Sequence, residues 1–221
     1  MLFDSLTNDE IVDSESALEF MKEATKLASS AELEDLSERV SRKAECFQGH
    51  LSLSLVDKLD EGNFDGIVSL IFSIGRKSKR LIDANGFENL RNMIRELLYG
   101  DAPVEDRFSL FVNQVDGIEE KMRINFAGEL LHYSMPDRYW LWTNWIWDPD
   151  NNTGALPLVV QEEVDLLGET EGETYLKVGE AMSYVNQVGN ERGYSRVGHG
   201  KFGIDVFLAC VYAVYMYRFS E

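Results

Sequence analysis

Apolar residues recur at intervals of three and four along most of the chain, and this spacing places them on one face of an α-helix. The pattern is strongest between Phe87 and Leu98, where an apolar stripe ends at Gly100. Similar patterns predict helices over about 16–28, 30–48, 63–74, 104–116, 118–133, 158–167, 173–188 and 202–219. The sequence therefore predicts an all-α protein, a single globular bundle of about eight to ten helices.

Capping and helix-stopping residues indicate where several of these helices begin and end. Ser16-Ala17-Leu18-Glu19 has the capping-box pattern, and Ser30 is a suitable N-cap for the next helix. Gly49 is expected to end that helix, and Pro136 forbids continuation of the helix before it. The run 51–55 has alternating leucines that would suit a strand, but its helical neighbours favour a helix.

The weakest point in this pattern lies near Asp101–Pro103, where one predicted helix ends and another begins. It divides the chain into an N-terminal helical region, 1–100, and a C-terminal helical region, 101–221. No linker rich in Pro, Gly or Ser separates them, so we expect the two regions to pack as one unit. The most apolar stretch, 202–219, is short for a membrane span, and we predict a long apolar C-terminal helix buried in the core.

Charge changes the picture of possible partners. The 221 residues include 21 Lys and Arg against 39 Asp and Glu, a formal net charge of -18. Such a charge disfavours binding to nucleic acid or to an anionic membrane, and it favours a protein partner with a basic or mixed-charge surface. A surface that imitates nucleic acid is the alternative. Two cysteines form no disulfide framework, and the first residues lack the basic start of a signal peptide, so we expect a cytoplasmic protein.

The charges are unevenly spread along the sequence. Between Gly75 and Gly100 six basic residues face three acidic ones, whereas 148–175 holds eight acidic residues and no Lys or Arg. The basic run Gly75–Arg80 is expected to end a helix, where the helix dipole favours cations. The functional alternative for this run is a surface for phosphate or for an acidic partner.

The segment 126–157 contains all four tryptophans and three of the four prolines of the chain. Trp, Tyr and Arg are enriched among the residues that anchor protein interfaces. The residues that we expect to contact a partner are Arg138, Tyr139, Trp140, Trp145 and Trp147. Trp142 and one neighbour are expected to pack beneath the last helix, with the other tryptophans near the surface beside the acidic loop.

A glycine-rich loop before the last helix is a candidate anion-binding site. It offers Arg192, Arg196, His199 and Lys201 next to a helix N-terminus, where backbone N–H groups can hold an anion. The loop lacks the P-loop pattern, and a connector that uses glycine for its turns is the simpler interpretation. Asp205, an acid at the head of an apolar helix, is a candidate buried functional acid or a partner for this loop.

Catalytic and metal-binding patterns are not evident in the sequence. Cys46 and His50 lie four residues apart, but zinc needs three or four ligands and no second pair is near. The sequence contains no GxSxG, HExxH or CxxC motif. His132 on a predicted helix end is more typical of a hydrogen-bonded structural residue than of a base. We therefore expect no catalytic residue, no metal and no cofactor.

The C-terminal half, about 105–218, resembles helical domains of bacterial defence and restriction systems, which are distantly like helix-hairpin-helix DNA glycosylases. The residues that carry the resemblance are Leu130, Leu131, His132, Tyr133, Pro136, Asp137, Arg138, Tyr139, Trp142 and Asn144, with Asp205 at the acidic position. The resemblance implies a helical fold and association with nucleic acid through Arg138, Trp142, Asp205 and the 192–201 loop. The chain departs from the pattern at Glu129, where a small or basic residue is usual, and it lacks the glycosylase hairpin motif.

Three functions follow from these observations. The leading hypothesis is a non-catalytic, acidic interaction or accessory subunit of a larger protein complex. The second is a nucleic-acid-associated protein of the glycosylase-like helical class, or a mimic of DNA. The third is a small-molecule enzyme with a pocket near the tryptophan-rich segment, in which Asp205 would act.

Overall fold

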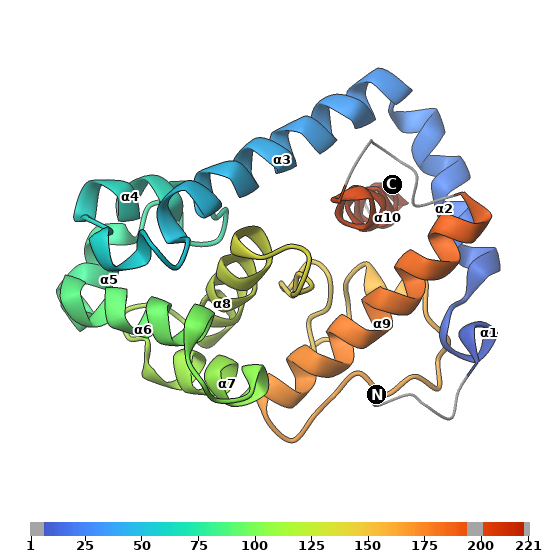
Figure 1. Ribbon diagram of the computed structural model, residues 1–221. Coiled ribbons are helices and arrows are strands. Elements are labelled where there is room, and N and C mark those ends of the chain that lie inside the picture. The colour runs from blue at the N-terminus through green and yellow to red at the C-terminus, as the bar shows by residue number, and fades with distance from the viewer. Residues whose placement is uncertain (1–6, 194–200, 219–221) are drawn as a thin grey trace. The chain divides into compact units, whose positions relative to one another are not determined.

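The computed structural model describes residues 7–193 and 201–218, and the regular elements in these two ranges are all helices (Figure 1). They are α1 (Asn8–Ile11), α2 (Ser14–Leu27), α3 (Ser30–Leu51), η1 (Val56–Lys58), α4 (Glu61–Ser69), α5 (Ser78–Asn85), α6 (Phe87–Tyr99), α7 (Val104–Gln114), α8 (Glu120–Ser134), η2 (Leu156–Leu158), α9 (Glu171–Arg192) and α10 (Gly203–Arg218). The η elements are single 3₁₀ turns. The prediction of an all-α protein with about eight to ten helices is confirmed.

The chain forms two compact units. The described residues of the first unit are 7–41, 143–167, 177–193 and 201–218, and the second unit consists of 42–142 and 168–176. The boundary falls inside α3 and α9, each of which is one continuous helix in Figure 1. The units are composed differently from the regions 1–100 and 101–221, and the expectation that those two regions pack as one unit stays a prediction.

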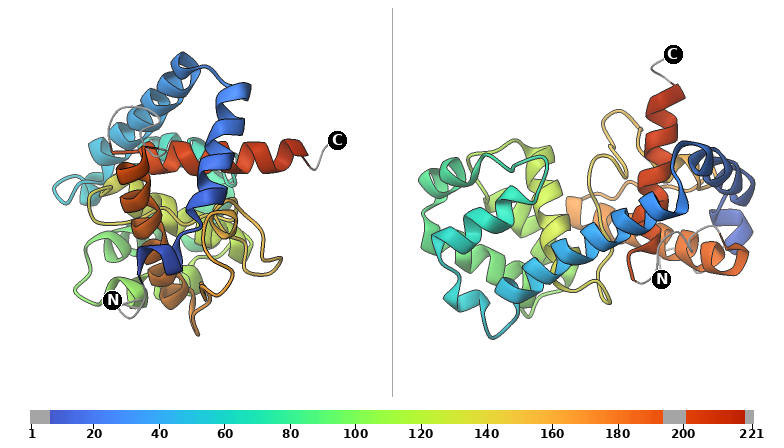
Figure 2. Two further views of the ribbon diagram at one scale, coloured as in Figure 1. Left: turned by 90° about the vertical axis from the view of Figure 1, so that its right-hand side faces the viewer. Right: turned by 90° about the horizontal axis from the view of Figure 1, so that it is seen from above.

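In the first unit, α2 packs against α10 (Figure 2). Their contact includes Ala24 of α2 and Val206, Cys210 and Val214 of α10, all of them buried. The first two turns of α10 are almost wholly buried, whereas Met216 and Tyr217 at its end are exposed. The prediction of a long apolar C-terminal helix in the core is confirmed, and the burial of its apolar side chains stabilises the unit.

In the second unit, α4 to α8 enclose an aromatic core. The Phe126 ring meets Phe64 and Phe111 edge-on, with ring centroids 6.4 and 5.4 Å apart. Phe108 stacks on Trp142 and on Tyr175, with centroid distances of 5.6 and 4.5 Å. Such pairs add to the stabilisation that burial of the rings already provides.

A glycine in α8 lets the tryptophan-rich segment approach the helix. A Cβ atom at Gly128 would collide with the backbone carbonyl of Trp142. Because glycine has no Cβ, the backbone of Trp142 lies directly against the helix. This close approach positions the segment that follows Pro136 in the second unit.

Several predicted boundaries are wrong. α2 begins at Ser14 with Asp13 as its N-cap, so Ser16 lies inside the helix. Gly49 does not end α3, which continues to Leu51, because buried Phe47 and Leu51 on either side hold the helix in place. Of the alternating leucines in 51–55, Leu51 is the last residue of α3, whereas Leu53 and Leu55 lie in the turn that follows, and Leu53 is exposed. The run Gly75–Arg80 does not end a helix, since Lys77 is the N-cap of α5 and the cations lie at its start.

The helix predicted over 158–167 is also absent, for a reason that lies elsewhere in the chain. Only the turn η2 is helical there. The backbone instead bonds to the α1–α2 junction, where Asp13 N donates to Val159 O and Gln161 N donates to Ile11 O, at 3.0 and 2.9 Å. These long-range bonds replace the local ones that a helix would make.

Candidate functional site

The four tryptophans occupy different environments. Trp142 is buried and stacks on Phe108 of α7 in the second unit. Trp147 is buried in the first unit, and Trp140 and Trp145 are half-buried. Trp145 lies beside Tyr212 of α10, with ring centroids 6.2 Å apart. Trp145 therefore faces the last helix.

In the second unit, Tyr139 and Trp140 belong to an internal hydrogen-bond network. The Arg107 guanidinium donates to the Tyr139 hydroxyl at 3.1 Å and also to the carbonyl of Leu97. A ring nitrogen of His132 lies 2.8 Å from the carbonyl oxygen of Tyr139, which agrees with a structural role for this histidine. The Tyr175 hydroxyl donates to the Trp140 carbonyl, and burial raises the pKa of that hydroxyl.

The expected partner-binding residues are therefore divided. Arg138, Tyr139 and Trp140 are in the second unit, and Trp145 and Trp147 are in the first. Arg138 is exposed and lies over the Tyr139 ring at 5.3 Å, while Tyr139 itself is buried. Whether any of the five contacts a partner stays a prediction. Trp147 is the one that lines a groove.

The groove lies in the first unit and has a volume of about 730 Å³. Trp147, Pro149, Asn152 and Pro157 line one part of it, and the stretch 160–167 lines the rest. Buried Trp147, Val160 and Leu166 contribute apolar side chains to a lining that also contains Asn152, Gln161 and three acidic residues. Its size is in the range of binding sites, and its lining is mixed.

Trp147 is held in the groove by the turn that follows it. Its ring N–H donates to Asn152 Oδ1 at 3.3 Å, and Asp148 and Thr153 exchange backbone hydrogen bonds. The turn needs a positive φ of 48° at Asn152 and of 133° at Gly154. A Cβ at Gly154 would collide with the Ile146 carbonyl, so only glycine permits this path.

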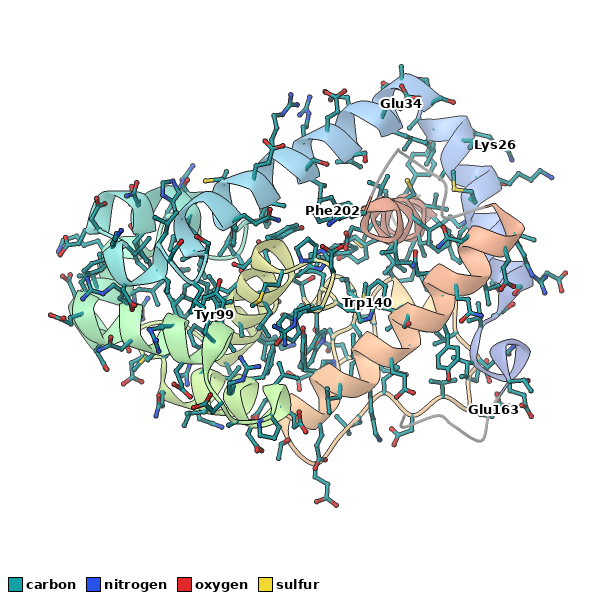
Figure 3. All side chains as sticks on the ribbon, in the orientation of Figure 1. Lys26, Glu34, Tyr99, Trp140, Glu163 and Phe202 are labelled. Carbon is teal, nitrogen blue, oxygen red and sulfur yellow. The ribbon has the colours of Figure 1, made fainter. Side chains whose placement is uncertain are left out.

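The opposite wall, 160–167, carries acidic side chains of two kinds. Asp165 pairs with Lys177 of α9 at 2.7 Å, and this hydrogen bond lowers the pKa of the carboxyl group. Glu162 and Glu163 are exposed and have no hydrogen bond or ion pair with any residue that the structure describes. Figure 3 labels Glu163 in the segment that precedes α9. Leu167 adds an exposed apolar side chain at the end of this wall, at 55% exposure.

The other sequence candidates are placed only in part. Arg192 and Lys201 are exposed, while Arg196 and His199 lie outside the described residues. Asp205 is 4% exposed in the first turn of α10, where the helix dipole favours an acid. Phe202, labelled in Figure 3, directly precedes this helix. The position of Asp205 is compatible with a structural role.

Within 7–193 and 201–218, no three His, Cys, Asp or Glu side chains gather as a metal site would require. None of the helices in this part of the chain is long and apolar enough to cross a membrane. Comparisons with protein-family models, with curated proteins and with solved structures give no match. The resemblance to helical domains of defence systems therefore stays a prediction.

Sequence reasoning missed the groove because it assigned one of its walls to a helix. The acidic residues of 162–165 and the exposed Leu167 were visible in the sequence, as were Pro149 and Pro157. What could not be seen was that residues 11–13 bond to 159–161 and hold that wall extended.

Proposed function

We propose that the chain is a non-catalytic interaction subunit that binds a basic segment of a partner protein in the groove beside Trp147. The observation that carries the proposal is a groove in which the apolar side chains of Trp147, Val160 and Leu166 lie beside two unpaired carboxylates, those of Glu162 and Glu163. A segment with one apolar side chain flanked by Lys or Arg matches this arrangement. The apolar side chain would enter against Trp147, and the cations would meet the acidic wall.

The charge of the whole chain supports a basic partner. At a net charge of -18 the protein attracts cations over a distance and speeds their encounter with the surface. The same field repels nucleic acid, whose binding depends on contacts between cations and phosphates. We therefore favour a protein partner over the nucleic-acid alternative.

The proposal is tested by titrating the full chain with a fluorescent peptide of lysines and arginines around one leucine. Two further peptides, one with serine in place of the leucine and one with glutamates in place of the cations, test each part of the recognition. The proposal predicts tighter binding of the first peptide than of either control. Equal binding of the leucine and serine peptides would mean charge attraction alone and would contradict it.

Matched variants locate the binding site. Glu162→Lys with Glu163→Lys places cations opposite the cations of the peptide, and we expect affinity to fall by roughly tenfold or more. The control, Glu34→Lys with Glu191→Lys, changes the net charge equally at exposed sites outside the groove lining (Figure 3 labels Glu34). An equal loss in both variants would exclude the groove. Low-salt gel shifts with duplex and single-stranded DNA test the nucleic-acid alternative in parallel.

A further inference from the structure

A fully exposed phenylalanine lies in the turn between α4 and α5 of the second unit. Phe72 is 101% exposed, so its whole ring is in solvent. The turn itself is well anchored, because Ile71 and Ile74 are completely buried on either side of Phe72. Backbone hydrogen bonds from Ile74 N to Ile71 O and from Lys77 N to Ile74 O, at 3.0 and 2.8 Å, fix its path. Phe72 is therefore exposed in a turn whose backbone is fixed by buried neighbours and hydrogen bonds.

Unpaired cations stand next to this ring. Arg76, Lys77 and Arg80 make no hydrogen bond or ion pair through their side chains with any residue in the described ranges. Their neighbour Lys79, by contrast, pairs with Asp83 at 2.8 Å. In a chain with 39 acidic and 21 basic residues, it is unexpected that three cations within five positions lack a carboxylate partner.

The helix does not explain these cations. They lie at the start of α5, where the helix dipole is positive and cations are disfavoured. No side chain caps this helix end, so the first N–H groups of α5 add to the positive potential. The Asp65 carboxylate lies at this helix end, where it accepts a hydrogen bond from the Ser78 hydroxyl, but it makes no ion pair with Arg76, Lys77 or Arg80. The three cations are therefore available to a partner outside the chain.

Two of the three cations, Arg76 and Lys77, border the same hollow as Phe72, and this hollow has a volume of about 530 Å³. It is lined by Ser69, Phe72, Ser73, Gly75, Arg76 and Lys77. The Ser73 hydroxyl is buried there without a hydrogen-bond partner. A ligand in this hollow would meet an aromatic ring and two cations.

We propose that residues 69–80 form a docking surface for an acidic segment of a partner protein that carries one apolar side chain. The carboxylates of the segment pair with Arg76, Lys77 and Arg80, and its apolar side chain covers Phe72. A nucleic acid or an anionic membrane would bring many negative charges near a chain of net charge -18, whereas a short segment brings few. This docking surface is basic, whereas the groove beside Trp147 is acidic, and the two are proposed as separate sites.

The test is a titration of the full chain with a fluorescent peptide of aspartates and glutamates around one phenylalanine. Phe72→Ala and the pair Arg76→Glu with Lys77→Glu should each weaken binding by about tenfold or more. The controls in the same unit are Leu53→Ala and Lys58→Glu, which alter an exposed leucine and an exposed, unpaired lysine and should change affinity less than about twofold. Circular dichroism confirms that every variant is folded.

Further probes separate this partner from other occupants. A peptide with serine in place of the phenylalanine should bind at least several-fold more weakly. The proposal is overturned if the two peptides bind equally, or if duplex DNA or phosphatidylserine vesicles bind more tightly through the same residues. It is also overturned if Phe72→Ala abolishes self-association of the chain while the acidic peptide does not bind.

Discussion

The ion pair between Lys43 of α3 and Glu129 of α8 shows how a buried carboxylate depends on a half-buried cation in the second unit. The Lys43 ammonium donates to Glu129 Oε2 and also lies 4.4 Å from the centroid of the Tyr133 ring. Burial raises the pKa of the Glu129 carboxyl, and Lys43 opposes this rise. Glu129 is a position where the chain departs from the pattern that it resembles, and Lys43 supplies the partner that an acid there requires.

Replacing Lys43 by methionine should leave Glu129 buried without its cation. We expect the free energy of unfolding to fall by roughly 2–4 kcal/mol at about pH 8, somewhat less than for a completely buried pair. The raised pKa of Glu129 sets the sign of the pH dependence. Below the unfolded pKa the buried carboxyl is protonated and neutral, so its burial does not destabilise the fold. As the pH rises through the folded pKa, the carboxyl becomes charged and the fold is destabilised. The loss of unfolding free energy caused by Lys43→Met should therefore be smaller at about pH 5 than at about pH 8.

Urea unfolding at both pH values measures this effect. The double variant Lys43→Met with Glu129→Gln removes the buried charge as well, and we expect it to recover most of the loss. An equal loss at both pH values would show that the missing packing of the lysine, and not the charge of Glu129, causes the instability.

At the scale of elements, helices with a strong apolar face are predictable and those with a weak one are not. The stripe of α6 from Phe87 to Leu98 predicted the helix and its end at Gly100. α5 was missed because it has only eight residues and buries only Leu81. The wall of the groove at 160–167 could not be predicted either, because its shape depends on hydrogen bonds to residues about 150 positions earlier in the chain.

The packing of α10 against α2 can be followed through Cys210. This cysteine is buried in the contact, and burial raises the pKa of its thiol to about 11. At about pH 8 it should therefore react with a thiol reagent only when α10 separates from α2. With Cys46 replaced by alanine, we expect labelling of the native chain to be slower than labelling of the unfolded chain by roughly a hundredfold or more.

A matched pair of variants on α2 checks that the labelling reports on this contact. Ala24→Leu adds volume to a buried position, and overpacking of this kind costs about 1–3 kcal/mol, so labelling of Cys210 should accelerate. Thr25→Leu changes the adjacent exposed residue and should leave the rate unchanged. Fast labelling of Cys210 in the chain that carries only Cys46→Ala would indicate that α10 is not held against α2.

At the scale of the whole molecule, the charge should affect the two proposed surfaces in opposite ways. The net charge of -18 attracts a basic peptide to the groove beside Trp147, and salt screens this attraction. We expect the association rate of the basic peptide to fall by about tenfold or more between low salt and about 0.5 M NaCl, with a smaller change in the dissociation rate. The acidic peptide is repelled at long range and attracted only near Arg76 and Lys77, so its association rate should rise or stay constant over the same range. Stopped-flow fluorescence measures both rates, and a fall for the acidic peptide as well would show that the local cations, rather than the net charge, govern its encounter.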